Sequence, residues 1–205
     1  MKVIKLTDKN IVEISFVAAE IIQSGGLIVY PTDTVYGLGV DATDDVAIEK
    51  LWKFKGGRDG KPLLLAVSGD KMAEKYIEIS ELGNNLIQKY WPGSVSVVGM
   101  SKNRTSKNVQ GEKETLGLRM PKNRFVLELI NILGKPITST SANVSGGKTC
   151  VSVEEFLTET SQEKLKLVDL FVDGGIIVGK LPSTIVDISK GKVEIVRMGE
   201  VKVEM

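Results

Sequence analysis

The sequence contains no histidine, only one cysteine and few aromatic residues. Without histidine there is no Ser-His-Asp triad, no Cys-His pair and no histidine-ligated zinc, and one thiol cannot complete a zinc site. Any chemistry must therefore use carboxylates, lysines, arginines, hydroxyls and backbone amides. These groups suit reactions that need mainly positioning and charge neutralisation, and transfer at phosphorus is the main example.

Long apolar runs are missing as well. No run approaches the roughly 18 residues that a membrane helix needs, and residues 1–5 do not resemble the start of a secretion signal. The lone thiol, Cys150, cannot form an internal disulfide. We therefore expect a cytoplasmic protein with no membrane partner.

The composition is that of a globular protein with an uneven distribution of charge. Its 205 residues, 42% hydrophobic and 26% charged, predict a single domain over residues 1–205. Residues 101–125 hold seven basic against two acidic side chains, and residues 154–173 hold six acidic against two basic ones. The basic segment favours an anionic ligand, either a nucleotide or RNA, although a solvated surface explains such a segment equally well.

Strand and helix patterns alternate along much of the chain, and strands cluster toward its end. Helical patterns cover residues 11–22, 44–54, 70–77, 80–90, 124–133 and 153–157. Strands are expected at residues 3–6, 27–30, 62–67, 94–100, 116–120, 135–140, 167–172, 184–188 and 193–196. This order predicts an α/β fold with a twisted open sheet of mixed and parallel strands, flanked by helices.

The first polar motif is Tyr30-Pro-Thr-Asp-Thr-Val-Tyr-Gly-Leu-Gly39, directly after a buried strand. Pro31 should end the strand in a sheet interior. The small polar side chains that follow would lie at the strand's end, where open α/β sheets bind ligands. A plain turn with capping hydroxyls is the alternative interpretation.

Two further segments are rich in ligand-binding groups. Residues 53–62 carry four cations and three glycines, which suit a phosphate, although a basic surface loop has the same composition. Residues 138–147 gather five hydroxyls and Asn143, which suit phosphate or ribose, although a Ser/Thr-rich turn would look alike. Residues 142–149 also match a lenient P-loop, but Thr149–Val153 is a poor helix start, which argues against that motif.

Taken in order, these segments resemble the YrdC/TsaC family of threonylcarbamoyl-AMP synthases. Each motif alone is weak, but the ordered set runs from residue 30 to residue 199. The matching pieces are Tyr30–Gly39, the basic loop before Lys61-Pro-Leu63, Leu118–Pro121, Thr140–Asn143 with Ser145-Gly146, Ser183–Asp187 and Arg197–Gly199.

The resemblance implies a reaction that this histidine-free sequence can support. The family joins L-threonine, bicarbonate or CO2, and ATP with its Mg²⁺, and it releases threonylcarbamoyl-AMP and pyrophosphate. A carbamate formed from threonine is already an anionic nucleophile, so no histidine base is needed. The implied partners are the downstream tRNA threonylcarbamoyl-transferase proteins, and direct contact with tRNA or double-stranded RNA is left open.

The resemblance also implies two sets of site residues, and we expect no metal site of histidine or cysteine ligands. Lys55 and Arg58 would face the phosphates as the catalytic cations, and Arg119 would hold threonine's carboxylate in a bidentate pair. The full nucleotide set is Lys55, Arg58, Lys61, Thr115, Ser141, Asn143 and Arg197. The threonine set is Thr34, Arg119, Ser139 and Ser183.

One departure from the family pattern and two alternative functions remain. The family loop usually reads Lys-x-Arg, whereas here Arg58 stands three residues after Lys55. Either the loop shifts by one residue, or Lys53 contributes instead. The alternative functions are an RNA-binding module of the same fold and a YciO-like paralogue that uses a different carbamate or acyl substrate.

Overall fold

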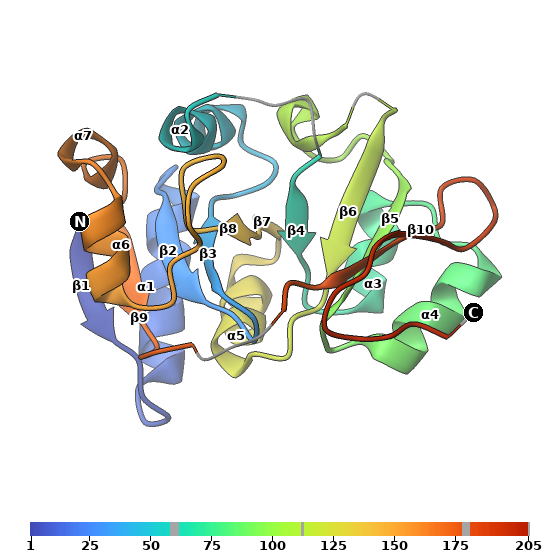
Figure 1. Cartoon of the computed structure of the whole chain (residues 1–205), viewed down its shortest axis with the longest axis horizontal. Coiled ribbons are helices and arrows are strands. Elements are labelled where there is room, and N and C mark those ends of the chain that lie inside the picture. The colour runs from blue at the N-terminus through green and yellow to red at the C-terminus, as the bar shows by residue number, and fades with distance from the viewer. Residues whose placement is uncertain (58–61, 112, 178–180, 205) are drawn as a thin grey trace.

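The strands form two mixed β-sheets that lie side by side and are covered by helices (Figure 1). This computed structural model describes residues 1–57, 62–111, 113–177 and 181–204. The predicted α/β fold with mixed strands and flanking helices is confirmed. The expectation of one open sheet is wrong, because the hydrogen bonding divides the strands between two sheets.

Among the described residues, the first sheet has five strands and both parallel and antiparallel pairs. Its first three strands are parallel to one another, and its last two join in antiparallel fashion. In spatial order they are β1 (Lys2–Lys5), β9 (Leu170–Asp173), β2 (Ile28–Pro31), β3 (Tyr36–Gly39) and β8 (Thr140–Ser141).

The second sheet has six strands in the part of the chain that the structure describes, and it is also mixed. Parallel pairs alternate with antiparallel ones across it. In spatial order the strands are β11 (Glu194–Arg197), β10 (Thr184–Asp187), β5 (Val95–Met100), β6 (Thr115–Arg119), β4 (Leu64–Ala66) and β7 (Ile137–Thr138).

The helices follow the apolar periodicity of the sequence closely. None in the described ranges is long and apolar enough to cross a membrane. They are α1 (Ile11–Gln23), α2 (Asp45–Lys55), α3 (Asp70–Tyr76), α4 (Glu81–Tyr90), α5 (Arg124–Leu133), α6 (Val153–Glu159), α7 (Gln162–Leu165) and the 3₁₀ turn η1 (Lys107–Val109). Asp44 accepts backbone hydrogen bonds at the start of α2, and Gly134 ends α5 in the left-handed conformation.

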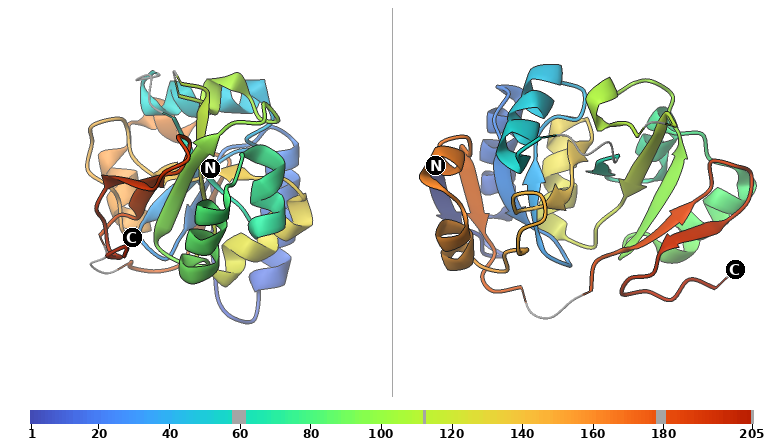
Figure 2. Two further views of the ribbon diagram at one scale, coloured as in Figure 1. Left: turned by 90° about the vertical axis from the view of Figure 1, so that its right-hand side faces the viewer. Right: turned by 45° about the horizontal axis from the view of Figure 1, so that its top comes forward.

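Alternate residues of the first sheet face two separate apolar cores. Val29 belongs to the core that includes α2 and α6, whereas Ile28 and Tyr30 belong to the core that includes α1 and α5. Each such fully buried aliphatic side chain stabilises the fold by about 1.5–3 kcal/mol. A third, smaller core joins α4 to β5 and β10 and includes Val203 of the C-terminal segment. The C-terminus therefore lies at the opposite end of the molecule from the N-terminus (Figure 2).

The first polar motif forms a β-hairpin, although the sequence predicted a strand followed by a loop. Pro31 pairs with Tyr36 across the hairpin, so the strand continues through proline, and residues 36–39 form a second strand. Gly39 makes room for the ring of Tyr30, because a Cβ there would lie 2.8 Å from that ring. Gly39 therefore allows close packing of β3 against β2.

The strand predicted at residues 135–140 divides between the two sheets at Ser139. Residues 137–138 pair with β4 in the second sheet, and residues 140–141 pair with β3 in the first. Tyr30 ties this crossing to the first sheet, since its hydroxyl donates to the Thr138 carbonyl at 2.9 Å. In Figure 1, β7 and β8 accordingly lie at the centre, between the strands of the two sheets.

Candidate active site between the two sheets

The main cavity has a volume of about 870 Å³ and is lined by residues from both sheets. The turn of the β2–β3 hairpin and β8 contribute from the first sheet, and β4, β5, β6 and β10 contribute from the second. The predicted site residues that line it are Thr34, Thr115, Arg119, Ser139, Ser141, Ser183 and Arg197. The fold thus brings together residues that are up to 163 positions apart in the sequence.

The other predicted residues are not in this lining. Lys55 and Asn143 lie beside it, in contact with Ser141, which does line the cavity. Arg58 and Lys61 fall outside the described residues. The structure therefore positions the predicted threonine set fully and the predicted nucleotide set in part.

Arg119 makes four side-chain hydrogen bonds to other residues that the structure describes. Its Nη2 donates to Asp33 Oδ2 at 2.7 Å and to Ser94 Oγ at 3.2 Å. Its Nη1 donates to Thr34 Oγ1 at 3.2 Å, and its Nε donates to the Gly93 carbonyl at 2.8 Å. The Nη atoms that an incoming carboxylate would contact therefore already donate hydrogen bonds to Thr34 and Asp33.

The hairpin turn that carries Thr34 is held by its own hydroxyls. Thr32 Oγ1 donates to the Val35 carbonyl at 2.6 Å and accepts from the Thr34 backbone N–H at 3.1 Å. The two threonine hydroxyls lie 3.1 Å apart. This local network fixes the turn, so that Thr34 faces Arg119 from the opposite sheet.

Arg197 reaches the cavity from β11 and is held more loosely. Its Nε and Nη2 donate to the Ser183 carbonyl at 3.2 and 2.8 Å, and Ser183 Oγ lies 2.9 Å from Ser96 Oγ. Arg197 remains exposed, but its partial burial, together with the charge of Arg119, lowers its pKa. Its charge is not matched by a carboxylate among the contacts that the described residues provide, which suits it to meet an anionic ligand.

Lys55 ends α2 beside the cavity and is buried. Its Nζ donates to the Ser141 carbonyl at 3.2 Å and to Asn143 Oδ1 at 3.0 Å, and Ser141 Oγ donates to Asn143 Oδ1 at 2.7 Å. Lys53 is exposed, so Lys55 is the lysine that lies against this hydroxyl and amide pair.

The carbonyls at the end of α2 are capped by other segments. Lys164 of α7 donates to the carbonyls of Lys53 and Phe54, and the Ser145 N–H donates to the Lys55 carbonyl at 3.0 Å. Such caps satisfy groups that a helix leaves without internal partners. They hold the end of α2, and with it Lys55, in a defined place.

Two tyrosines near the site do not act as bases. Burial raises the pKa of Tyr30, and burial raises the pKa of Tyr36 to about 12. Both phenols therefore stay protonated near neutral pH. The Tyr36 hydroxyl instead donates to the Gly175 carbonyl at 2.7 Å and holds the segment that follows β9.

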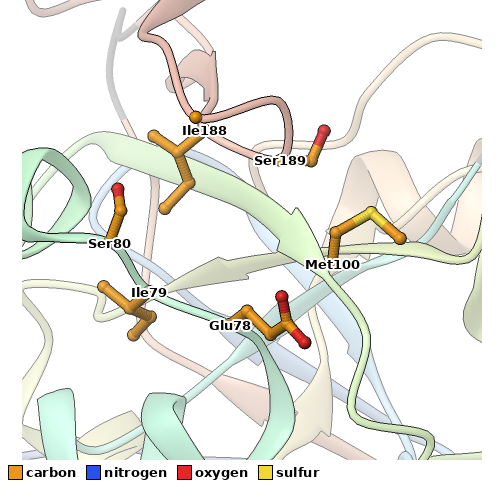
Figure 3. A pocket seen from close by; sticks show the side chains of 7 residues that line it. Glu78, Ile79, Ser80, Met100, Ile188 and Ser189 are labelled. Carbon is orange, nitrogen blue, oxygen red and sulfur yellow. The ribbon is translucent and has the colours of Figure 1, made fainter.

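A second cavity, of about 270 Å³, differs in chemistry from the first. It lies where the segment between α3 and α4 meets the ends of β5 and β10 (Figure 3). Its lining in the described structure combines apolar side chains with two serines and a single carboxylate, and it includes no arginine or lysine. The lining residues are Glu78, Ile79, Ser80, Met100, Ile188, Ser189 and Gly191. We therefore place the candidate active site in the larger cavity.

The basic segment at residues 101–125 does not form one patch. Strand β6 lies within it, so that Lys102, Arg104 and Lys107 precede the strand and Lys122 follows it. Arg119 is the last residue of β6 and is buried in the cavity. The segment's charges are therefore divided between the two ends of a strand and the cavity.

The fold and the cavity define a two-sheet α/β protein whose central site offers two arginines and a row of hydroxyls to a small anionic ligand. A family model described as "Telomere recombination", named for Sua5, YciO and YrdC, matches residues 20–199. The chain belongs to this Sua5/YciO/YrdC family, and the resemblance predicted from the sequence is confirmed.

Relatives in this family carry names that describe an activity. A putative threonylcarbamoyl-AMP synthase of Methanocaldococcus jannaschii is 30% identical over 207 residues, which cover 99% of this chain and 95% of that protein. A threonylcarbamoyl-AMP synthase of Pyrococcus abyssi is 29% identical over 189 residues, which cover 92% of this chain. This chain spans 54% of the length of the P. abyssi protein.

Structural similarity extends over nearly the whole chain. The crystal structure of P. abyssi Sua5 complexed with L-threonine superposes with a TM-score of 0.85 at 28% sequence identity. The match covers 97% of this chain and 58% of that one. The two-sheet arrangement is thus shared with a protein that binds L-threonine.

Proposed function

We propose that this protein joins ATP to a carbamate formed from L-threonine and bicarbonate or CO2, giving threonylcarbamoyl-AMP and pyrophosphate. The observation that carries the proposal is the cavity in which Thr34, Arg119 and Ser183 lie near Ser141 and Arg197. It offers cations and hydroxyls for two anionic substrates in one space. The names of the M. jannaschii and P. abyssi relatives support the same reaction.

The proposed chemistry requires positioning more than proton transfer. Threonine's amine and CO2 form a carbamate, one of whose oxygens attacks the α-phosphorus of ATP. A new P–O bond forms, the bond to the β-phosphate oxygen breaks, and pyrophosphate leaves. The site must hold two anions in contact and neutralise the charge that develops at phosphorus.

We assign the residues in and beside the cavity to two regions, one for each substrate. Arg119 with Thr34, Ser139 and Ser183 would hold threonine, since the first of these is a charged donor and the others are hydroxyls. Ser141 and Asn143, with Lys55 against them, would bind phosphate or ribose on the other side, and Thr115 and Arg197 would complete the nucleotide region. The catalytic role proposed for Lys55 is to neutralise phosphate charge, and Arg58 and Lys61 would add to it.

Magnesium would enter as part of the ATP substrate. Mg²⁺ bound to a nucleotide keeps several waters and usually takes one or two protein carboxylates. Asp187 is the carboxylate that lines the cavity in the described part of the chain, and no cluster of three or more His, Cys, Asp or Glu residues occurs among those residues. This arrangement fits an ion carried by the triphosphate.

The product would be consumed by another protein. An acyl-adenylate is a high-energy mixed anhydride, so we place the reaction beside the tRNA threonylcarbamoyl-transferase that takes up the group. The compartment proposed is the cytoplasm, where ATP, threonine and tRNA are present together. Direct contact with tRNA or double-stranded RNA would use the exposed lysines and arginines around β6.

Omission of single substrates tests the proposal. Purified protein is incubated with Mg-ATP, L-threonine and bicarbonate, and both pyrophosphate and the adenylate are measured, the latter by mass spectrometry. Formation of threonylcarbamoyl-AMP should stop when any one of the three is left out. Formation of pyrophosphate without threonine, or with another amino acid in its place, would contradict the proposed substrate.

The same assay separates the alternative functions. The family model also covers YciO, so a paralogue with another carbamate or acyl substrate has support in the comparison itself. Turnover with such a substrate but not with threonine would favour that paralogue. RNA binding without any turnover, unchanged by substitution of Arg119 or Ser141, would favour an RNA-binding module.

A further inference from the structure

Arg119 is held by an ion pair that joins the two sheets. Asp33 lies in the hairpin turn of the first sheet, and Arg119 ends β6 of the second. Both side chains are nearly buried, at 10% and 7% exposure, and their charged atoms are 2.7 Å apart. A buried pair of this kind contributes little net stability, but its short charge-assisted hydrogen bond restricts the geometry of the guanidinium.

The Asp33 carboxylate forms its ion pair with Arg119. Its Oδ2 accepts from Arg119 and lies 3.4 Å from Ser94 Oγ. Its Oδ1 is buried and has no hydrogen-bond partner among the described residues. Asp33 is also absent from the cavity lining, whereas its neighbours Thr32 and Thr34 are part of it. Its position is thus that of a residue that acts through Arg119.

A second contact reaches Arg119 from the C-terminal segment. Ser94 Oγ accepts from Arg119 Nη2 and lies 2.9 Å from Glu200 Oε2. A hydroxyl has one proton to donate, and the shorter distance favours Glu200 over Asp33 as its acceptor. This gives a chain of hydrogen bonds from Arg119 through Ser94 to Glu200.

The segment that carries Glu200 is itself fixed against the cavity wall. The Glu200 N–H donates to the Pro182 carbonyl at 3.0 Å, and Gly199 approaches so closely that a Cβ there would lie 2.1 Å from the same oxygen. Arg197, which lines the cavity, lies on the same short segment. Glu200 therefore has a defined position from which to accept the Ser94 hydroxyl.

We infer that Asp33 is a positioning residue for Arg119, aided by Ser94 and Glu200, and that it selects the orientation in which Arg119 meets the amino-acid substrate. Asp33 holds Nη2 on the protein side, and the Gly93 carbonyl holds Nε, so Nη1 and Thr34 Oγ1 are the donors turned toward the substrate. The carboxylate would then be bound by Nη1 and the neighbouring hydroxyls, not by the symmetric fork expected from the sequence. This inference rests on the proposed function for the identity of the substrate.

The test replaces the charge of Asp33 while keeping its shape. In Asp33→Asn the KM for L-threonine should rise about 10-fold, which is the lower end of the loss expected for a charge-assisted hydrogen bond. The KM for ATP should change less than about twofold, because the nucleotide region does not include Arg119. Ser94→Ala, a smaller change in the same chain, should raise the threonine KM by about threefold.

Asp41 provides a matched control. It is a buried aspartate whose ion pair with Lys135 has the same 2.7 Å distance, and it does not line the cavity. Asp41→Asn should leave both KM values unchanged. Equal increases in the two KM values for Asp33→Asn, or a threonine effect in Asp41→Asn of the same size, would overturn the inference.

A measurement without turnover separates this inference from the proposed function. In ¹⁵N NMR of the wild-type protein, the Arg119 Nε–H should exchange slowly because it is bonded to the Gly93 carbonyl. Asp33→Asn should shift this signal and speed its exchange, and Asp41→Asn should not. An unchanged signal in Asp33→Asn would refute the positioning role whatever the substrate is. Failure of the wild-type protein to use threonine would refute only the proposed function.

Discussion

The two arginines of the cavity are held in opposite ways. Arg119 is buried, pairs with Asp33 and donates from all three of its nitrogens, whereas Arg197 is exposed and contacts Ser183. A guanidinium that is paired with a carboxylate mainly fixes the orientation of a bound ligand. A guanidinium without such a partner mainly attracts an anionic ligand. From this comparison we propose that Arg119 orients one substrate and that Arg197 attracts the other.

Removal of Arg119 should have the largest effect. Arg119→Ala should raise the KM for threonine about 100-fold and the KM for ATP far less. The variant loses a charged donor, and Thr34 loses the hydrogen bond that holds its side chain. The substitution should also lower the free energy of unfolding by about 3 kcal/mol, since Asp33 would be left buried without its partner. Steady-state kinetics and urea unfolding measure the two effects.

A second variant, Arg119→Lys, distinguishes a loss of threonine binding from a loss of folding. Arg119→Lys keeps the charge near Asp33 but cannot reproduce the contacts of the guanidinium. Its stability should be closer to that of the wild type, while the threonine KM stays raised. Equal increases in the KM for threonine and for ATP would show that Arg119 has been assigned to the wrong substrate.

Removal of Lys55 should have the next largest effect, on the other side of the cavity. Lys55→Ala should lower kcat/KM for ATP by about 50-fold, because the cation that we propose to lie beside the phosphates is lost and Asn143 loses a donor. The KM for threonine should change little. Lys53→Ala serves as the control, since Lys53 is exposed and should give near wild-type kinetics. A larger effect of Lys53→Ala than of Lys55→Ala would favour the alternative in which Lys53 contributes instead.

A smaller change is expected for Arg197. Arg197→Ala should raise the KM for ATP by about 10-fold and should leave stability nearly unchanged, since the side chain is exposed. The increase should shrink at high salt if attraction is its main contribution. Salt-independent kinetics together with a large loss of stability would mean that Arg197 is structural.

The smallest effect on activity is expected from the tyrosine that joins the two sheets. Tyr30→Phe leaves the Thr138 carbonyl without its 2.9 Å donor in a buried place. The free energy of unfolding should fall by about 1–3 kcal/mol, with both KM values within about twofold of wild type. Denaturant unfolding followed by kinetics checks this, and a large change in either KM would place Tyr30 in the site itself.

Local patterns predicted most elements because they leave a periodic signal in the sequence. Helix α1 shows its buried stripe at Ile11, Ile14 and Ile22, and α5 covers the residues 124–133 that its periodicity predicts. Strand β3 was not predicted, because Gly37 and Gly39 lower its strand propensity. The division of residues 135–140 at Ser139 left no local signal, because strand pairing with two different sheets decides it.

The site was predicted from motifs, and its supporting contacts were not. Thr34 and Arg119 belong to recognisable segments, and the structure places both in one cavity, although their roles stay predictions. Ser94 and Glu200 are 106 positions apart, and neither stands in a motif that distinguishes it. Asp33 was visible beside Thr34, but its partner could be identified only once the two sheets were in place.

Equilibrium binding to Arg119→Ala and Arg197→Ala tests the central comparison most directly. Calorimetry measures the affinity of each variant for L-threonine and for a non-hydrolysable ATP analogue, with the wild-type protein alongside. Arg119→Ala should lose threonine affinity and keep nucleotide affinity, and Arg197→Ala should do the reverse. A loss of both ligands by the same factor in either variant would contradict the division of the cavity between the two arginines.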